Sequence, residues 1–223
     1  MFKKYIVLLL IFFCVSGGSF ALVIYRSSNP QQVALTFDDG PTLGVTDKIL
    51  DILKEENVKA TFFVIGRKIG QNPEIIKRMA AEGHEIGNHS YSHEKLTSLD
   101  SQMAEVELRQ TSNLITNQTG RPVNLYRPPH GALNYEKRKL VENRGYDVVM
   151  WSVNADDFLH ENSVMRSPIS IVNRIMSRLQ GGDIVLMHDN SRQIVEAMPQ
   201  LIKKLKARDR NFVTISQLLG REK

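Results

Sequence analysis

Residues 33–41 read Val-Ala-Leu-Thr-Phe-Asp-Asp-Gly-Pro. The first five of these residues form a short apolar run that is typical of a buried strand, and the following Asp-Asp-Gly-Pro predicts a turn. Two adjacent carboxylates, Asp38 and Asp39, therefore stand at the carboxyl end of a predicted strand. Because Asp-Asp-Gly is an ordinary turn sequence, the pair alone does not indicate a functional site.

Similar short apolar runs recur along the chain and alternate with longer amphipathic stretches. The runs predict strands at residues 33–37, 60–64, 84–87, 125–126, 147–151, 184–187 and 212–213. The stretches between them predict helices at residues 46–55, 73–82, 100–118, 134–143, 170–179, 193–207 and 216–219. On the long helix, Met103, Val106, Leu114 and Ile115 lie partly on one stripe. This alternation predicts a parallel α/β fold, and about seven repeats favour a closed or nearly closed barrel over an open doubly wound sheet.

Composition excludes several classes of protein. The chain has 223 residues with 42% hydrophobic and 24% charged side chains, which is typical of a folded domain rather than a disordered one. Its one cysteine, Cys14, cannot form an intrachain disulfide. The net charge of +5 includes three positive charges from Lys3, Lys4 and Arg26. The rest of the chain has no clustered basic run, so we expect no nucleic-acid partner.

The amino-terminal segment predicts export. Lys3 and Lys4 precede an apolar stretch that reaches Tyr25 with one Ser-Gly-Gly-Ser interruption. This pattern fits a cleaved signal peptide, and its length of about 20 residues also fits an uncleaved membrane anchor. We therefore expect a signal peptide or membrane anchor at residues 1–26, a polar linker at 27–32 and one domain at 33–220. The domain would be extracytoplasmic, at the cell surface or secreted.

Further polar residues follow the other predicted strands, which is where α/β barrels build active sites. His89 and His93 are four residues apart, so one helical turn would place both imidazoles on one face, within reach of one metal ion. A bare pair of this kind is weak evidence, but His130 and His188 also lie at predicted strand ends. Two histidines and one carboxylate form a facial ligand set that leaves positions open for water and substrate.

Five segments, at residues 36–41, 88–93, 126–131, 151–158 and 184–189, together resemble a known family. In this order they are similar to the five motifs of the polysaccharide deacetylases, the group with the nodulation chitooligosaccharide deacetylase homology domain (carbohydrate esterase family 4). The resemblance covers about residues 31–219. It implies a distorted (β/α) barrel, here with about seven parallel strands.

The resemblance also implies roles for individual residues. Asp39, His89 and His93 would bind a divalent metal, commonly zinc and sometimes cobalt or manganese. Asp38 would be the general base and His188 the general acid, with Arg127 orienting the base and Asp157 orienting and tuning the acid. The substrate pocket would include Pro128, the backbone N–H of His130, Phe158 and Leu186.

Three positions depart from the family pattern. His130 stands where tyrosine is usual, Asn154 replaces the first aspartate of the fourth motif, and Phe158 replaces tryptophan. None of these removes an implied metal ligand, base or acid, so we expect activity and leave the substrate preference open.

The expected reaction is metal-dependent hydrolysis of the N-acetyl group of amino sugars, N-acetylglucosamine or N-acetylmuramic acid, with release of acetate. The expected polymer is a cell-surface polysaccharide, first of all peptidoglycan, while chitin-like oligomers and exopolysaccharide remain alternatives. A non-catalytic carbohydrate-binding relative would predict decay of the motifs. A non-haem iron oxygenase would share the ligand set but predicts an all-β body.

Overall fold

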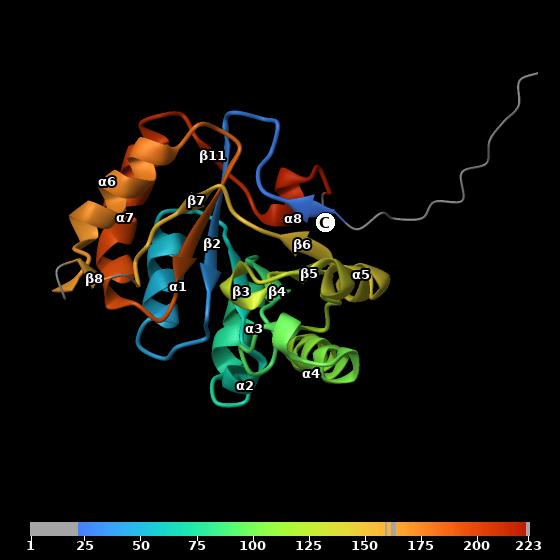
Figure 1. The fold of residues 1–223 in the computed structure, drawn as a ribbon. Coiled ribbons are helices and arrows are strands. Elements are labelled where there is room, and N and C mark those ends of the chain that lie inside the picture. The colour runs from blue at the N-terminus through green and yellow to red at the C-terminus, as the bar shows by residue number, and fades with distance from the viewer. Residues whose placement is uncertain (1–21, 159, 162–163, 222–223) are drawn as a thin grey trace, which may run out of the picture.

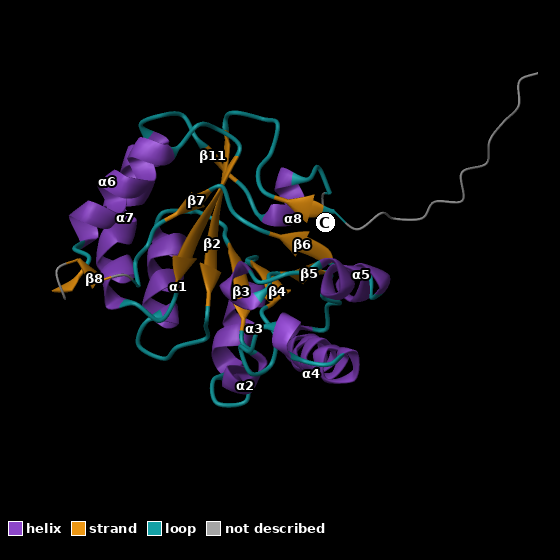
Figure 2. Cartoon of the chain, viewed as in Figure 1, coloured by secondary structure: helices purple, strands orange, loops and turns teal. Residues whose placement is uncertain are grey.

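The computed structural model describes residues 22–158, 160–161 and 164–221, and its centre is a parallel β-sheet of nine strands. Figure 1 shows the strands gathered at the centre, with helices around them. The strand order is β1-β6-β5-β4-β3-β2-β10-β7, and β11 pairs with β2. Figure 2 shows the same arrangement by type of element. The predicted parallel α/β architecture is confirmed.

The elements follow one another as strand and helix along most of the chain. The strands of the main sheet are β1 Val23–Ile24, β2 Gln32–Asp38, β3 Thr61–Val64, β4 Glu85–Asn88, β5 Leu125–Tyr126, β6 Asp147–Val149, β7 Val153–Asn154, β10 Asp183–His188 and β11 Asn211–Phe212. The α-helices are α1 Thr46–Glu55, α2 Gly66–Ile69, α3 Pro73–Ala81, α4 Ser101–Thr119, α5 Tyr135–Asn143, α6 Pro168–Arg178, α7 Arg192–Lys206 and α8 Ile215–Leu218. A hairpin of β8 His160–Glu161 and β9 Val164–Met165 forms a separate antiparallel pair.

The connection between β6 and β7 shows that the sheet curls into a barrel. These strands lie near opposite ends of the strand order, yet only residues 150–152 separate them in sequence. A link of that length spans at most about 14 Å, so the two edges of the sheet must approach each other. No strand pairing between β1 and β7 is found within the described residues, so the barrel keeps an open seam. A nearly closed, distorted barrel was predicted and is confirmed.

Residues 26–27, which follow β1, reach across this seam to the start of β10. Arg26 forms an antiparallel bridge with Asp183 and donates a 3.1 Å hydrogen bond to its carboxylate, and Ser27 N–H donates to Gly182 O at 2.7 Å. The polar composition of residues 27–32 suggested a linker, but the structure packs this loop against the start of β10. Residues 23–24, which were expected to belong to the signal peptide or anchor, form β1 and pair with β6. The folded body therefore begins earlier than residue 33.

The apolar run before residue 22 lies outside the described residues, so its assignment as signal peptide or anchor stays a prediction. Within the described part of the chain, no helix is long and apolar enough to cross a bilayer.

Side-chain alternation along the strands divides the core into two parts. In β2, Val33, Leu35 and Phe37 pack with the outer helices, whereas Ala34 packs inside the barrel with residues of other strands. Helix α8 closes the amino-terminal mouth, where Ile215 N–H donates to Thr61 Oγ1 at 3.1 Å. Because side chains alternate with period two, Thr36 and Asp38 share the inward face with Ala34. The inward face thus carries the functional groups towards the opposite, carboxyl-terminal mouth.

Two expectations about elements need correction. Strands β1 and β7, each of two residues, were not predicted, because such short segments carry no clear periodicity. The predicted stripe of α4 is only partly right: Ile115 is buried and Leu114 packs against the core, but Met103 is exposed. The other buried residues of the helix are Ala104, Glu107, Leu108 and Thr111. A glutamate therefore occupies the buried face of this helix.

The seam contact predicts a difference between two glycines that have nearly the same positive φ. Gly182 and Gly120 have φ values of 67° and 68°. A Cβ at residue 182 would lie 2.2 Å from Ser27 O, whereas one at residue 120 would meet nothing within 4 Å. Gly120→Ala should cost about 1–2 kcal/mol for the left-handed conformation, and Gly182→Ala a further 1–3 kcal/mol or so for the clash. Urea unfolding measures both, and equal losses would contradict the seam packing.

Candidate active site and metal centre

The site begins with two neighbouring strand ends. β2 and β10 pair in parallel with Asp38 opposite His188, so both side chains reach the same mouth of the barrel. Asp38 is almost fully buried, at 3% exposure. Asp39 follows at φ 77°, an uncommon conformation for a non-glycine residue that turns its side chain away from the strand pattern. The carboxyl ends of strands from distant parts of the chain therefore meet here.

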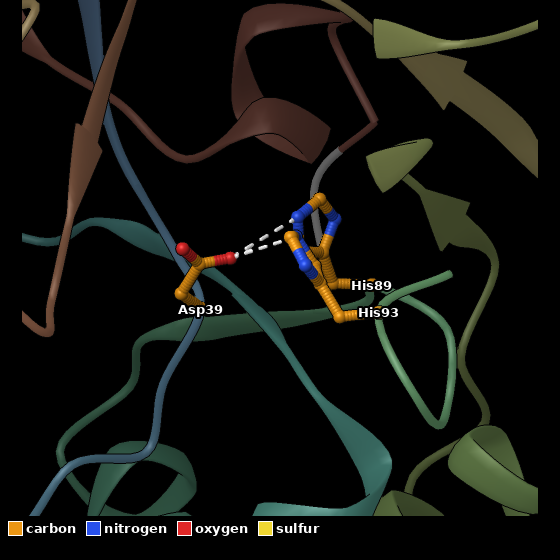
Figure 3. Close-up of side chains that lie close together, drawn as sticks. All are labelled: Asp39, His89 and His93. Carbon is orange, nitrogen blue, oxygen red and sulfur yellow. Dashed lines mark ion pairs between the residues drawn. The ribbon is translucent and has the colours of Figure 1, made fainter. Parts of the chain in front are cut away.

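Asp39, His89 and His93 lie around one point. Figure 3 shows the Asp39 carboxylate pointing towards the two imidazoles. Its Oδ1 lies 3.5 Å from Nε2 of His89 and 3.0 Å from Nε2 of His93, and one ligand atom from each residue lies within 4.8 Å of the others. The structure thus brings together the three side chains that the sequence singled out.

The donor atoms at this point fit a divalent cation. Asp39 Oδ1 is buried and receives no hydrogen bond from the described residues. His89 Nδ1 lies 2.7 Å from Arg127 O, and a carbonyl can only accept, so Nδ1 carries the proton and Nε2 presents a lone pair. Nitrogen and carboxylate ligands with one such outer hydrogen bond are typical of zinc sites.

Electrostatics favours the metal-binding forms of these groups. Burial lowers the pKa of His89, which keeps its imidazole neutral. Burial alone would raise the pKa of Asp39, but the His93 imidazole 3.0 Å from Oδ1 and the positive charge of His188 outweigh this and hold that pKa below its usual range. An ionised carboxylate and a neutral imidazole are the forms that coordinate a cation.

The two histidines do not share a helical turn, as their spacing suggested. Residues 89–93 form an irregular loop in which Ser90 and His93 have φ values of 63° and 70°. The loop doubles back because Ser90 N–H donates to Asn88 Oδ1 and His93 N–H donates to Ser90 Oγ. The imidazoles still converge, with ring centroids 5.0 Å apart. The expected helix is wrong, although the two rings do lie together.

Arg127 holds Asp38 from inside the barrel. Its guanidinium donates to Asp38 Oδ1 at 2.7 Å, to Thr36 Oγ1 at 2.8 Å and to two backbone carbonyls near the end of β6. The side chain is fully buried and lies 4.1 Å over the Phe63 ring. With Oδ1 fixed in this way, Asp38 turns Oδ2 towards His89 Nε2, 3.7 Å away.

Asp157 holds His188 on the other side. Its carboxylate accepts from the backbone N–H and from Nδ1 of His188, both at 2.9 Å. Burial acts to lower the pKa of His188, but the hydrogen bond and charge of Asp157, with the charges of Asp38 and Asp39, raise it to about 9. The imidazole is therefore protonated at neutral pH and can donate a proton from Nε2.

The four residues named for the substrate pocket occupy different depths. His130, at φ 59°, is exposed, and its ring centroid lies 4.7 Å from that of His93. Phe158, 48% exposed, meets the His188 ring edge-on at 5.0 Å. Leu186 is buried on β10 and Pro128 is buried beside Arg127. Only His130 and Phe158 thus stand open at the mouth.

Several supporting residues were not predicted. Lys68 Nζ donates to Asp39 O at 2.7 Å, and Asn190 Nδ2 donates to Asp39 Oδ2 at 3.2 Å.

Asp189 lies directly behind Gly40 and accepts a hydrogen bond from Thr46 Oγ1 at 2.7 Å. A Cβ at residue 40 would overlap the Asp189 carboxylate. Burial and the nearby charges of Asp39 and Asp38 raise the pKa of Asp189 to about 7, against the Thr46 hydrogen bond and Lys68. The Asp189 side chain points behind the turn, which the sequence pattern did not reveal.

Comparison with known proteins supports one family. The polysaccharide deacetylase profile matches residues 25–149. The chain is 36% identical over 195 residues to the peptidoglycan-N-acetylglucosamine deacetylase PgdA of Listeria monocytogenes, covering 87% of this chain and 40% of that protein. It is 39% identical over 190 residues to the peptidoglycan-N-acetylmuramic acid deacetylase PdaC of Bacillus subtilis, covering 85% and 39%. The chain thus spans about two fifths of these relatives.

Solved structures agree with this assignment. The fold matches the Bc1960 peptidoglycan N-acetylglucosamine deacetylase with a TM-score of 0.85 and 34% identity, over 92% of this chain and 95% of that one. It also matches BA3943 from Bacillus anthracis, described as a CE4 family pseudoenzyme, with a TM-score of 0.82 and 32% identity over 89% and 69%. With its profile match, its curved parallel barrel and these relatives, the chain belongs to the polysaccharide deacetylase family.

Proposed function

We propose that this protein is a metal-dependent hydrolase that removes the N-acetyl group from amino sugars of a cell-surface polysaccharide and releases acetate. The observation that carries the proposal is the convergence of Asp39, His89 and His93 between a carboxylate fixed by arginine and a histidine fixed by aspartate. Hydrolysis of an unactivated amide needs a strong nucleophile, a base and an acid, and this arrangement supplies groups for each.

In this proposal Asp39, His89 and His93 hold the metal, which would be zinc, with cobalt or manganese as alternatives. A bound metal of this kind lowers the pKa of a water molecule towards about 7 and polarises a carbonyl. The contribution of the protein is to keep the ligand atoms in their binding forms and to leave one side of the site open.

Asp38 is the proposed general base. Arg127 occupies its Oδ1, so Oδ2 is the oxygen left to accept a proton at the metal site. Because Arg127 is fully buried and also bonded to Thr36 and to backbone, it cannot follow a moving carboxylate. The base is thus held in one orientation before substrate arrives, as preorganised catalysis requires.

His188 is the proposed general acid. Its Nδ1 proton is held by Asp157, which directs Nε2 away from the barrel wall. A protonated Nε2 can give its proton to the departing amine, which leaves poorly as an anion. Phe158 packs edge-on against this imidazole and, with Leu186, Pro128 and the backbone N–H of His130, is proposed to bound the acetyl group.

Peptidoglycan is the proposed polymer. Relatives named for action on N-acetylglucosamine and on N-acetylmuramic acid residues of peptidoglycan match at similar identity, 36% and 39%. The predicted export segment fits a substrate outside the cytoplasm, with the protein either anchored in the membrane or secreted. The changes at His130, Asn154 and Phe158 bear on which of the two sugars is preferred.

A non-catalytic binding role is the main alternative, because a pseudoenzyme shares the fold. The presence of the base, the acid and all three metal-binding side chains in this chain favours an active enzyme. A non-haem iron oxygenase is disfavoured, since the main sheet is parallel and alternates with helices.

An assay of acetate release tests the proposal. We expect the purified protein to release acetate from peptidoglycan, to lose this activity after treatment with a chelator and to regain it with Zn²⁺. Chitooligosaccharides, tested in parallel, separate a peptidoglycan enzyme from one that acts on chitin-like oligomers. Acetate release that persists in protein shown by elemental analysis to be free of metal would contradict the proposal.

The matched variant in the same assay is Asp38→Asn, which keeps the shape of the side chain. Loss of a positioned base should lower kcat by about 10²- to 10⁴-fold while the metal content stays at the wild-type level. Turnover at the wild-type rate would remove Asp38 as the base.

The pH profile tests the acid. Activity should fall as pH rises through the pKa of His188, and a bound cation, by offsetting the charge of Asp39, should place this descending limb below the value of about 9. Asp157→Asn removes the negative charge and one of the two acceptor oxygens that hold His188, so the pKa of His188 should fall and the descending limb should move to lower pH. Asp156→Asn is the control, because Asp156 pairs with Arg174 instead. An unchanged limb in Asp157→Asn would argue against His188 as the acid.

A further inference from the structure

We infer that Glu107, on helix α4, is a positioning residue for the metal centre: its carboxylate fixes the loop that carries His89 and His93 and thereby sets the affinity for metal. The inference rests on the proposed function, in which these two histidines bind the cation. Glu107 lies outside all five motif segments, and no step of the proposed reaction uses it.

One carboxylate oxygen makes the contact. Glu107 Oε2 accepts hydrogen bonds from the backbone N–H groups of Tyr91 and Ser92, both at 2.8 Å. These residues lie between the two histidines, so the carboxylate holds the middle of the loop. A second tie from the same helix begins the loop, since Asn88 Nδ2 donates to Leu108 O at 2.7 Å.

The other backbone donors of the loop have partners close to the strand ends. His89 N–H donates to Val64 O at 3.0 Å, Ser90 N–H to Asn88 Oδ1 at 2.8 Å and His93 N–H to Ser90 Oγ at 3.0 Å. Only the two central N–H groups depend on a side chain from a helix. Removal of that acceptor leaves both donors without their partner at once.

The loop conformation needs such support. Ser90 and His93 both adopt positive φ, which is uncommon for residues other than glycine and persists where surroundings impose it. Helix α4 also abuts the loop from behind: a Cβ at Gly66 would lie 2.4 Å from Thr111 Oγ1 and 2.7 Å from the Tyr91 ring. Thr111 is one turn beyond Glu107 on the same face, so helix, glycine and loop pack as one unit.

Burial strengthens the contact. Glu107 is only 8% exposed, and burial of a carboxylate costs free energy unless the group accepts hydrogen bonds. Bonds to an ionised acceptor are roughly twice as strong as those between neutral groups. Outer groups that orient metal ligands typically change affinity by about 10- to 100-fold when removed.

The experiment measures metal binding by the full metal-free protein, without substrate. Zn²⁺ is titrated in competition with a chromophoric chelator, and Co²⁺ absorption reports the ligand geometry. We expect Glu107→Ala to weaken Zn²⁺ binding by about 10- to 100-fold. Glu107→Gln should weaken it less, because its amide oxygen can still accept both N–H groups without the charge.

Glu105→Gln is the matched control. Glu105 lies two residues earlier on the same helix, and its carboxylate pairs with Arg144 at the surface. This variant removes the same charge from α4 without touching the loop, so its Kd for Zn²⁺ should equal that of wild type. Thermal unfolding of the metal-free variants separates lost stability from lost affinity.

Wild-type Zn²⁺ affinity and Co²⁺ spectrum in both folded Glu107 variants, with at most a lower Tm, would overturn the positioning role and leave the proposed deacetylase function intact. An equal loss in Glu105→Gln would also overturn it. Weakened binding confined to the Glu107 variants, in a protein that releases no acetate, would support the inference and count against the proposed function.

Discussion

The buried ion pair between Arg127 and Asp38 is the contact on which the rest of the site depends. The guanidinium joins Asp38 on β2 to the carbonyls at the end of β6, and so ties the two sides of the barrel mouth. The backbone carbonyl of Arg127 accepts a hydrogen bond from Nδ1 of His89 and so sets the tautomer of that imidazole. Loss of one partner of such a pair leaves an uncompensated buried charge, at a typical cost of about 3–5 kcal/mol. The orientation of the proposed base Asp38, the tautomer of the proposed metal ligand His89 and the link between β2 and β6 therefore all depend on Arg127.

Side chains of the same type differ in charge state or orientation at this site because they have different hydrogen-bonding partners. Asp38 and Asp39 are adjacent, but the first is bound by arginine and the second faces two imidazoles. His89 and His188 differ in the same way: burial keeps the first neutral, whereas a buried carboxylate raises the pKa of the second to about 9. The barrel thus supplies both lone-pair donors and a proton donor within one mouth.

Much of this was accessible from sequence, for a physical reason. Parallel strands present their carboxyl ends at one edge, so polar residues after strands, such as Asp38 and His188, could be expected to meet. The helical turn predicted for His89 and His93 was wrong. The backbone N–H groups of Ser90 and His93 donate to the side chains of Asn88 and Ser90, and these hydrogen bonds reverse the chain. Strand β1 was not predicted because it continues the leading apolar run. The role of Glu107 was not predicted because the stripe of α4 was assigned through Met103, and a buried glutamate can be identified only when the buried face of its helix is known.

We propose that Asp39, His89 and His93 share one cation, and anomalous X-ray diffraction at the zinc edge detects such an ion where it is bound. Crystals grown with Zn²⁺ should give one strong anomalous peak within about 2.0–2.2 Å of Nε2 of both histidines and of an Asp39 oxygen. Asp38 should remain on Arg127 and outside the coordination sphere. A peak that lies elsewhere, or the absence of any peak among these three side chains at saturating zinc, would contradict the account.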